Sequence, residues 1–321
     1  MSLLERVRGC TFDDFLFVPQ LGEVPSRNPA LLDLSTSFTA GIRLQRPLVS
    51  ANMDTVTRAP MAIVMAEEGG IGVIDRGFRA GDIEPQVTEV ATVKRTQHGT
   101  VSDPLSIGVS GSVAEARRVM RAAQVGTLVV VDADGRLAGL ITERDVRFVD
   151  GAAEVRDRMT PRDRLVVHIG TLSLQDAERV MVERKVKKLP LVGADGRVIG
   201  LVTARDLIKH REHPFATRDG QGRLRVAAAI GATGDYLERA AELLRVGADA
   251  LVIDIAHGHS RVMERAMLGV RARFGDVPLV AGNVATAEGV AFLLNLGADA
   301  IKVGIGPGGG CTTRLATNFG V

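Results

Sequence analysis

The sequence predicts an α/β fold: a (β/α)8 TIM barrel, of which only about six βα units are present, with a second module inserted into it. Three observations predict this fold. Apolar strands alternate with helical patterns, polar residues follow the ends of many strands, and one stretch within residues 101–211 repeats itself. A chain of 321 residues with 45% hydrophobic content can bury more than one core.

Six short segments are apolar at nearly every position, which is typical of parallel strands covered on both faces. Helical patterns separate most of them, for example at 59–68, 235–246 and 287–296. Gly-Ala-Asp-Ala at 247–250 recurs at 297–300, each time between a helix and the next strand, which indicates a repeated βα unit. The strands are expected at 47–52, 70–74, 225–231, 250–256, 278–284 and 300–306.

Polar residues follow the ends of four of these strands. A barrel builds its site from the carboxyl ends of many strands, whereas a doubly wound sheet concentrates its functional groups at one crevice. The spread of polar residues therefore favours the barrel. These residues are Ser50, Asn52 and Asp54, then Asp254, His257 and His259, then Asn283 and Thr286, and finally Cys311 and Thr313.

The number of strands is too small for a closed barrel. A barrel has eight strands and typically about 250 residues, whereas the chain outside the insert has room for only six strands. We therefore expect the last two βα units to be missing after Val321.

The insert contains two copies of one pattern, because residues 112–147 match 173–208 at a constant offset of 61 without a gap. Each copy predicts a helix, a strand, an Asp-Gly hairpin turn, a second strand and a helix that opens near Thr-x-Arg-Asp. The pair resembles cystathionine-β-synthase-type (CBS) repeats, which in many relatives bind adenine nucleotides. That resemblance implies nucleotide contacts at Thr142, Asp145, Thr203 and Asp206. Alternatively, the two aspartates only cap their helices.

The expected domains are the first part of the barrel at 1–100, the tandem CBS module at 101–211, and the second part of the barrel at 212–321. The formal net charge is +2, and no basic stretch has interleaved aromatic residues, so we expect no nucleic-acid partner. No apolar stretch approaches the roughly 18 residues of a membrane span. The N-terminus does not resemble a signal peptide and there are only two cysteines, Cys10 and Cys311, so a cytoplasmic location is expected.

Cys311 follows a strand and a glycine-rich loop, and three interpretations of this loop remain open. Gly304, Gly306 and Gly309 fit the G-x-G-x-x-G dinucleotide fingerprint. The glycines could instead serve a tight turn, with Cys311 a small buried residue. Finally, Cys311 could be a nucleophile whose pKa is lowered by loop amides or by Arg314.

Six motifs spread along the chain are together highly specific. They are TFDDFLFVP at 11–19, SANMDTVT at 50–57, EEGGIGVI at 67–74, VIDIAHGHS at 252–260, AGNVAT at 281–286 and IKVGIGPGGGCTT at 301–313. With these motifs the chain resembles inosine-5′-monophosphate (IMP) dehydrogenase and its relative GMP reductase. Insertion of a CBS pair after the second βα unit is also the usual plan of IMP dehydrogenases.

The resemblance implies an NAD-dependent oxidation of IMP to XMP in guanine nucleotide biosynthesis. Cys311 would attack C2 of the purine, a hydride would pass to NAD, and water would hydrolyse the resulting thioimidate. Thr313 would help to activate that water, and Asn283 would approach the reacting groups. Full-length members of the family are usually tetramers, so a homo-oligomer is expected.

The resemblance also implies the residues that bind each ligand. NAD would be held by Asp254, Ile255, Ala256, Gly304, Ile305 and Gly306. The purine nucleotide would lie against Met53, with its phosphate near Gly309. A potassium ion would be coordinated by the backbone carbonyls of Gly306, Gly308 and Cys311.

The sequence departs from the family at two places. Gly309 stands where the family usually has a serine that bonds the nucleotide phosphate, so that the phosphate would rest on backbone amides. The family's mobile flap, with its catalytic arginine, lies beyond Val321, and we therefore expect this chain to lack residues needed for activity.

Two alternatives to an IMP dehydrogenase stay open. GMP reductase uses the same cysteine and threonine to deaminate GMP to IMP with NADPH. The three consecutive glycines before Cys311 also allow a non-catalytic protein that senses adenine or guanine nucleotides through its CBS pair.

Overall fold

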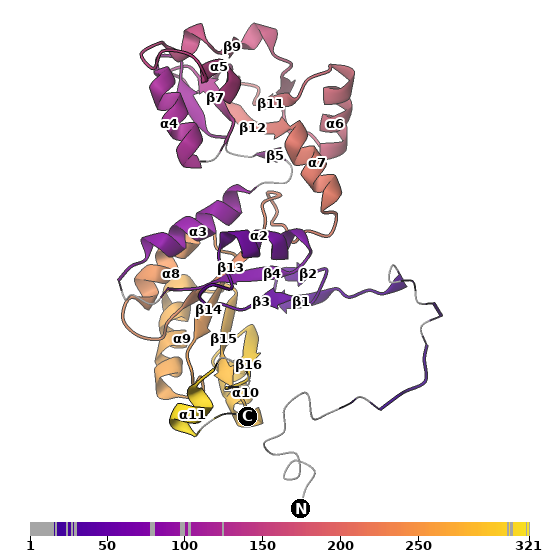
Figure 1. Cartoon of the computed structure of the whole chain (residues 1–321), viewed down its shortest axis with the longest axis vertical. Helices are drawn as coiled ribbons and strands as arrows, with labels where there is room; N and C mark the ends of the chain where they lie inside the picture. The colour runs from indigo at the N-terminus through magenta and orange to yellow at the C-terminus, as the bar shows by residue number, and fades with distance from the viewer. Residues whose placement is uncertain are drawn as a thin grey trace, which may run out of the picture. The chain divides into compact units, whose positions relative to one another are not determined.

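The computed structural model describes the chain in several stretches, which are residues 16, 18–23, 25–26, 28, 31–77, 81–96, 100–101, 104–123, 125–306, 308, 311–318 and 320. The chain divides into two compact units (Figure 1). The first consists of Met1–Thr96, Phe215–Arg218 and Leu224–Val321, and the second of Gln97–Pro214 and Asp219–Arg223. None of the helices in these stretches has the length and hydropathy needed to cross a bilayer.

The first unit contains a parallel sheet of six strands in the order β16-β15-β14-β13-β4-β3. The order follows the chain without reversal, as in a barrel, whereas a doubly wound sheet reverses direction. The sheet is a curled half-barrel, so the prediction of a barrel-type α/β fold with six strands is confirmed to this extent. The strands are β3 (Val49–Ser50), β4 (Ile71–Ile74), β13 (Val226–Ile230), β14 (Ala250–Asp254), β15 (Leu279–Val284) and β16 (Ala300–Val303).

Helices cover one face of this sheet, and their buried side chains form the larger core of the unit. They are α2 (Ala59–Glu67), α3 (Glu84–Arg95), α8 (Tyr236–Arg245), α9 (Arg261–Phe274) and α10 (Ala287–Asn295). The short α11 (Thr313–Thr317) follows them in the chain and has no buried residue. The three helical segments predicted from the sequence are therefore confirmed to within one residue at each end.

The other face of the sheet carries small residues and is covered by a hairpin. Strands β1 (Thr36–Thr39) and β2 (Ile42–Leu44) are antiparallel, and Ile42 and Leu44 pack against Ile71, Val73 and the alanines of β13. This hairpin is absent from the sequence-based prediction, because its strands are too short to show a clear alternation. The hairpin therefore buries part of this face of the sheet.

The repeated Gly-Ala-Asp-Ala segments hold successive strands together by the same contact. The Asp249 carboxylate accepts a hydrogen bond of 2.9 Å from the Val226 amide at the start of β13. The Asp299 carboxylate likewise accepts one of 2.8 Å from the Leu279 amide at the start of β15. The prediction of a repeated βα unit is thus confirmed, and each aspartate ties the beginning of its own strand to the preceding one.

A buried arginine joins three segments behind the sheet. Arg239 of α8 is only 3% exposed. It donates hydrogen bonds to Asp235 and to the side-chain oxygen of Gln86 on α3, both at 2.9 Å. It also donates to the carbonyls of Arg76 (3.0 Å) and Asp82 (3.3 Å) in the loop between β4 and α3. One side chain therefore satisfies four acceptors from three elements.

The second unit repeats one arrangement twice, as the internal repeat predicts. Its sheets have the strand orders β6-β7-β8-β9 and β10-β11-β12-β5. The Asp-Gly turns place Gly135 at φ 77° and Gly196 at φ 82°, where glycine is favoured. The strands are β5 (Thr100–Val101), β6 (Ser106–Gly108), β7 (Thr127–Val131), β8 (Leu137–Thr142), β9 (Thr160–Pro161), β10 (His168–Ile169), β11 (Lys188–Val192) and β12 (Val198–Thr203). The helices are α4 (Val113–Ala123), α5 (Glu143–Val146), α6 (Leu174–Glu183) and α7 (Ala204–Glu212).

Candidate active site

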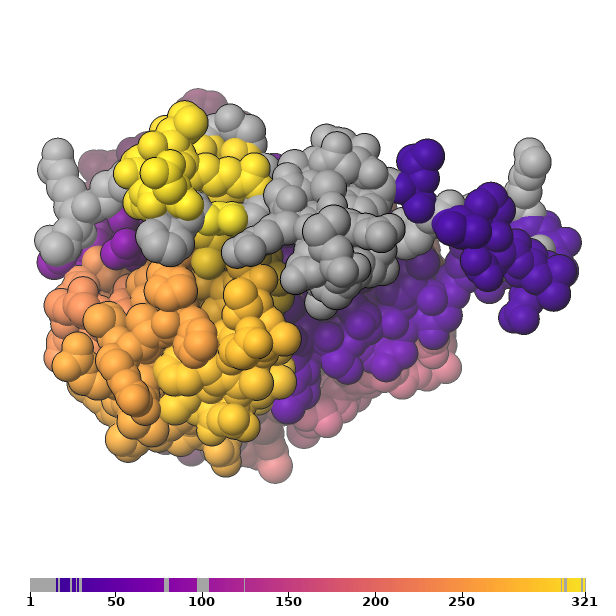
Figure 2. All heavy atoms as spheres, turned by 90° about the horizontal axis from the view of Figure 1, so that it is seen from below, coloured from indigo at the N-terminus to yellow at the C-terminus, as the bar shows by residue number. Residues whose placement is uncertain are grey.

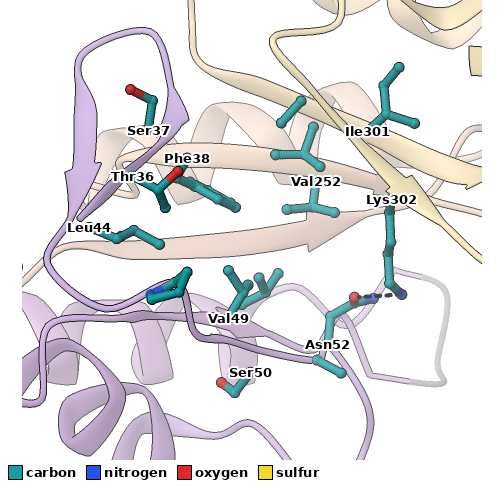
Figure 3. A pocket seen from close by; sticks show the side chains of 15 residues that line it. Thr36, Ser37, Phe38, Leu44, Val49, Ser50, Asn52, Val252, Ile301 and Lys302 are labelled. Carbon is teal, nitrogen blue, oxygen red and sulfur yellow. Dashed lines mark hydrogen bonds between the residues drawn. The ribbon is translucent and has the colours of Figure 1, made fainter. Parts of the chain in front are cut away.

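Three polar side chains meet at the carboxyl edge of the half-barrel. The Lys302 ammonium lies 2.5 Å from the Asp254 Oδ2 at the end of β14, and the Asn52 Nδ2 lies 2.7 Å from the same oxygen. Lys302 also donates to the Asn52 Oδ1 at 3.2 Å (Figure 3). We call Asn52, Asp254 and Lys302 the polar triad. Because it comes from β14, β16 and the loop after β3, the fold has to form before the triad can.

The polar triad borders a pocket on the concave face of the sheet. Its other lining is mainly apolar and comes from the hairpin and strands, for example Phe38, Val49 and Val252 (Figure 3). The polar residues of its lining are Asn52 and Lys302 together with Thr36, Ser37 and Ser50. A site with an apolar wall and a few convergent polar groups is typical of small-molecule binding.

Asn283 brings several predicted site residues together by backbone contacts. Its Nδ2 donates to the Gly304 carbonyl at 2.7 Å, and its backbone amide donates to the Ile255 carbonyl at 2.8 Å. Its side-chain Oδ1 is buried and has no hydrogen-bond partner among the residues that the structure describes. A buried acceptor without a partner is costly, so this oxygen is available to a donor on a ligand.

Cys311 is exposed and lies beside Thr313. The Cys311 Sγ is 3.3 Å from the Thr313 Oγ1. Hydrogen bonds from the side chain and backbone of Thr313 lower the pKa of the Cys311 thiol, and the charge of Arg314 lowers it further. The thiolate is the nucleophilic form of cysteine, so these contacts increase the fraction of the reactive species at a given pH. The alternative in which Cys311 is a buried structural residue is wrong.

In the loop before Cys311, the backbone angle and the space at Gly306 both require a glycine. Gly306 has φ 78°, and a Cβ there would lie 2.8 Å from the Arg314 Cγ. The Gly308 carbonyl accepts a hydrogen bond of 3.0 Å from the Cys311 amide. Gly309 lies outside the described residues. Figure 2 shows the yellow C-terminal segment with α11 on the surface of the first unit.

The remaining predicted residues are less tightly grouped. Met53, in the loop after β3, has a side chain that is 57% exposed. Ile305 is half-buried and Ala256 is exposed. Among the described residues, no hydrogen bond joins the Cys311–Thr313 pair to Asp254 or Asn283, and no group of three His, Cys, Asp or Glu could hold a metal ion.

In the second unit, each Thr-x-Arg-Asp segment forms a helix cap. Asp145 Oδ2 accepts from both the amide (2.8 Å) and the hydroxyl (2.7 Å) of Thr142. The Thr203 hydroxyl donates to Asp206 Oδ2 at 2.6 Å and accepts from the Asp206 amide at 3.3 Å. Capping is thus what these residues do in this structure, and their contact with a nucleotide stays a prediction.

The comparison with protein families shows to which family the chain belongs. A family model described as the IMP dehydrogenase / GMP reductase domain matches residues 9–321. The chain belongs to this family. The resemblance inferred from the six motifs is therefore confirmed at the level of the family.

Individual relatives are similar over nearly the whole chain. The inosine-5′-monophosphate dehydrogenase of Aquifex aeolicus is 42% identical over 316 residues, which cover 98% of this chain and 63% of that protein. That of Rhodopirellula baltica is 43% identical over 314 residues, covering 98% of this chain and 57% of the relative. The chain thus spans about three fifths of the length of these curated relatives.

Solved structures of GMP reductase from Trypanosoma brucei are also similar. The complex with guanosine 5′-triphosphate has a TM-score of 0.86 at 37% identity, covering 97% of this chain and 74% of that one. A cysteine-to-alanine variant with guanosine 5′-monophosphate has a TM-score of 0.84 at 36% identity, covering 95% of this chain and 64% of that one.

The contact between Thr313 and Cys311 gives a first testable expectation. In a Cys10→Ser background, Thr313→Val is expected to move the pH profile of Cys311 alkylation by iodoacetamide to higher pH. The variant loses the hydroxyl that stabilises the thiolate, so the thiol pKa rises and less thiolate is present at any pH below it. Thr312→Val is the control, because the hydrogen bond described for the Cys311 sulfur joins it to Thr313 and not to Thr312. Superimposable profiles for Thr313→Val and Thr312→Val would show that Thr313 does not act on the thiol.

Proposed function

We propose that the protein is an NAD-dependent IMP dehydrogenase that oxidises IMP to XMP in guanine nucleotide biosynthesis. The observation that carries this proposal is an exposed cysteine after β16, with a lowered pKa and Thr313 at hydrogen-bond distance. The curated relatives quoted above have the same activity in their names. Because the chain covers less than two thirds of their length, the reaction is assigned to the complete gene product.

In the proposed reaction, Cys311 supplies the nucleophile. Its thiolate forms a bond to C2 of the purine, and the hydride from that carbon leaves to the oxidant. Water then adds to the same carbon, the C–S bond breaks, XMP is released and the free thiol is regenerated. Thr313 is suited to hold that water, because its hydroxyl already lies 3.3 Å from the sulfur. Asn283 is suited to meet a polar group of the reactants with its unpartnered oxygen.

The polar groups of the site fit a dinucleotide with ribose hydroxyls. Asp254 has a carboxylate at the open edge of the sheet, and a carboxylate is a strong acceptor for paired hydroxyls. Asp254, Ile255, Ala256, Gly304, Ile305 and Gly306 would hold NAD. When bound, NAD supplies the nicotinamide ring that accepts the hydride. IMP would lie against Met53, with its phosphate near Gly309.

The donor set of the cysteine loop fits a potassium ion. The carbonyls of Gly306, Gly308 and Cys311 are neutral oxygens, and the Gly308 oxygen keeps a second lone pair beside its bond to the Cys311 amide. Coordination would fix the loop that carries the nucleophile. Replacing potassium by lithium in the assay is therefore expected to lower turnover.

The second unit is proposed to be the tandem CBS module, inserted between the barrel parts 1–100 and 212–321. The support is its internal repeat, since both copies fold as helix, hairpin and helix. We propose that it binds adenine or guanine nucleotides at Thr142, Asp145, Thr203 and Asp206. A homotetramer in the cytoplasm is proposed for the full-length protein.

GMP reductase is the second candidate, because the Trypanosoma brucei structures named above carry that activity. The two candidates differ in their substrates. The complete gene product should form NADH from IMP and NAD, and should not consume NADPH with GMP. NADPH consumption with GMP, without NADH formation from IMP, would overturn the dehydrogenase assignment.

The polar triad allows a further test of the proposed site. Lys302→Met is expected to lower kcat/KM for IMP oxidation about 10–100-fold, because a charge-assisted hydrogen bond contributes roughly 1.5–3 kcal/mol. Lys302→Arg keeps the charge next to Asp254 and should retain most of the activity. If both variants lose activity equally, the charge of Lys302 is not what the site requires. Thermal unfolding of both variants would separate this effect from a loss of folded protein.

A further inference from the structure

A short loop after β3 carries two of the residues assigned to the ligands. It runs from Ala51 to Val56 and precedes α2. Asn52 belongs to the polar triad, where its Nδ2 lies 2.7 Å from the Asp254 carboxylate. Met53, the next residue, is 57% exposed and is proposed to lie against the purine nucleotide. The placement of both side chains therefore depends on the backbone of this loop.

Thr57 joins the two ends of the loop. It is fully buried, with 0% of its surface exposed. The Thr57 hydroxyl donates to the Ala51 carbonyl, where the loop begins, and its Oγ1 lies 3.0 Å from the Ser50 Oγ at the end of β3. The Thr57 amide donates to the Met53 carbonyl at 3.2 Å. One residue thus fixes the start and the middle of the loop.

Within the loop, one residue has a costly backbone conformation. Thr55 is β-branched and has φ 62°, in the left-handed region that such residues rarely adopt. This conformation persists only where the surrounding contacts determine it. The Thr55 amide donates to Asp54 Oδ1 at 3.0 Å, and the same oxygen accepts from Arg58 at 2.8 Å. The Asp54–Arg58 pair and Thr57 therefore fix the chain on both sides of Thr55.

These two sets of contacts differ in their exposure to water. The Arg58 and Asp54 side chains are 34% and 38% exposed, so water can replace part of their interaction. The Thr57 hydroxyl is enclosed, and its removal would leave the Ala51 carbonyl without this donor. An acceptor that loses its partner away from water carries the full desolvation cost. Of the two, the Thr57 hydroxyl therefore has the larger influence on the loop.

We propose that Thr57 is a positioning residue for the reaction, because its hydroxyl fixes the loop so that Met53 meets the purine nucleotide and Asn52 stays in the polar triad. The inference rests on the proposed function, in which those two side chains contact the ligands or their partners. It adds a buried residue that acts through others. The nucleophile belongs to a different loop, after β16, so Thr57 acts on binding rather than on the thiol.

Steady-state kinetics of the complete gene product tests this role. Thr57→Val keeps the shape of the side chain without the hydroxyl, and it is expected to raise the KM for IMP about tenfold, the size of one lost hydrogen bond. The kcat should change by less than about threefold, since weaker uniform binding appears in KM. Thr57→Ser keeps the hydroxyl and should keep the KM of the unsubstituted protein. Thr92→Val is the matched control, because its hydroxyl donates to the Thr88 carbonyl within α3, and it should change neither constant.

Hydrogen exchange of the 321-residue chain gives a readout that does not depend on turnover. The amides of Val56 and Thr57 both donate to the Met53 carbonyl. Thr57→Val should therefore exchange these two amides about tenfold faster, because the loop opens more often. Thr57→Ser should exchange them at the original rate. Thermal unfolding would show that each variant is folded.

The outcomes separate this inference from the proposed function. An unchanged KM for IMP in Thr57→Val would overturn the positioning role, and so would unchanged exchange of the two amides. An equal rise of KM in Thr57→Ser would also overturn it, because the hydroxyl would then not be the group that matters. Faster exchange in Thr57→Val, restored in Thr57→Ser, in a protein that does not oxidise IMP would support the control of the loop by Thr57 and contradict the proposed function.

Discussion

Cys311→Ala in the complete gene product is expected to reduce NADH formation from IMP by about a thousandfold or more, because removing a covalent nucleophile eliminates the bond-forming step. The affinity for IMP should change only a few-fold, since the sulfur contributes mainly to chemistry. The Cys311 side chain is exposed, so the fold should tolerate the change. Turnover by stopped-flow absorbance and binding by calorimetry would measure the two effects separately.

Cys10→Ser is the matched control for this experiment, because it removes the other cysteine of the chain. It should keep normal turnover. Substantial activity in Cys311→Ala would contradict covalent catalysis by this thiol. Absence of any turnover by the unsubstituted protein, combined with nucleotide binding to the second unit, would instead favour a sensing role.

Arg239→Leu is expected to destabilise the first unit by about 3–5 kcal/mol, the usual effect of removing one partner from a buried ionic network. Leucine cannot donate to Asp235, to Gln86 or to the two carbonyls that the guanidinium now satisfies. Each acceptor would be left with incomplete hydrogen bonding in a water-poor region. Urea unfolding would show the effect as a lower midpoint of the transition that belongs to this unit.

Arg245→Leu provides the control on the same helix. Arg245 is 63% exposed and pairs with Glu242 at the surface, so its loss should change the free energy of unfolding by no more than about 0.5 kcal/mol. Equal midpoints for Arg239→Leu and Arg245→Leu would show that the buried network is replaceable by apolar packing.

The strands could be predicted because burial on both faces requires apolar residues at nearly every position of a strand. β13 and β14 are almost entirely buried and correspondingly apolar. The preference for a barrel over a doubly wound sheet followed from polar residues at many strand ends, because a doubly wound sheet concentrates its functional groups at one crevice. The hairpin over the concave face left no comparable signal, since Ile42 and Leu44 belong to a strand of only three residues.

The site was only partly predictable. Cys311 and Thr313 are two residues apart, so their contact is local. Loop amides or Arg314 were expected to lower the pKa of the thiol, whereas the hydrogen bonds of Thr313 have the larger effect and Arg314 a smaller one. Lys302 was missed, because one lysine in an apolar strand does not reveal that it points toward Asp254 and Asn52. That contact joins residues 48 and 250 positions apart and depends on the curvature of the sheet. Distance in sequence, more than residue type, limited the prediction.

The aspartate contacts at the starts of β13 and β15 bear on how the half-barrel assembles. Each links a strand to its immediate predecessor in the chain, so a newly formed unit can be secured before any later one exists. Assembly can then advance stepwise from neighbour to neighbour, with modest loop-closure entropy at each step. Loss of one of these hydrogen bonds should destabilise the pairing of its own two strands before it affects strands farther along the sheet.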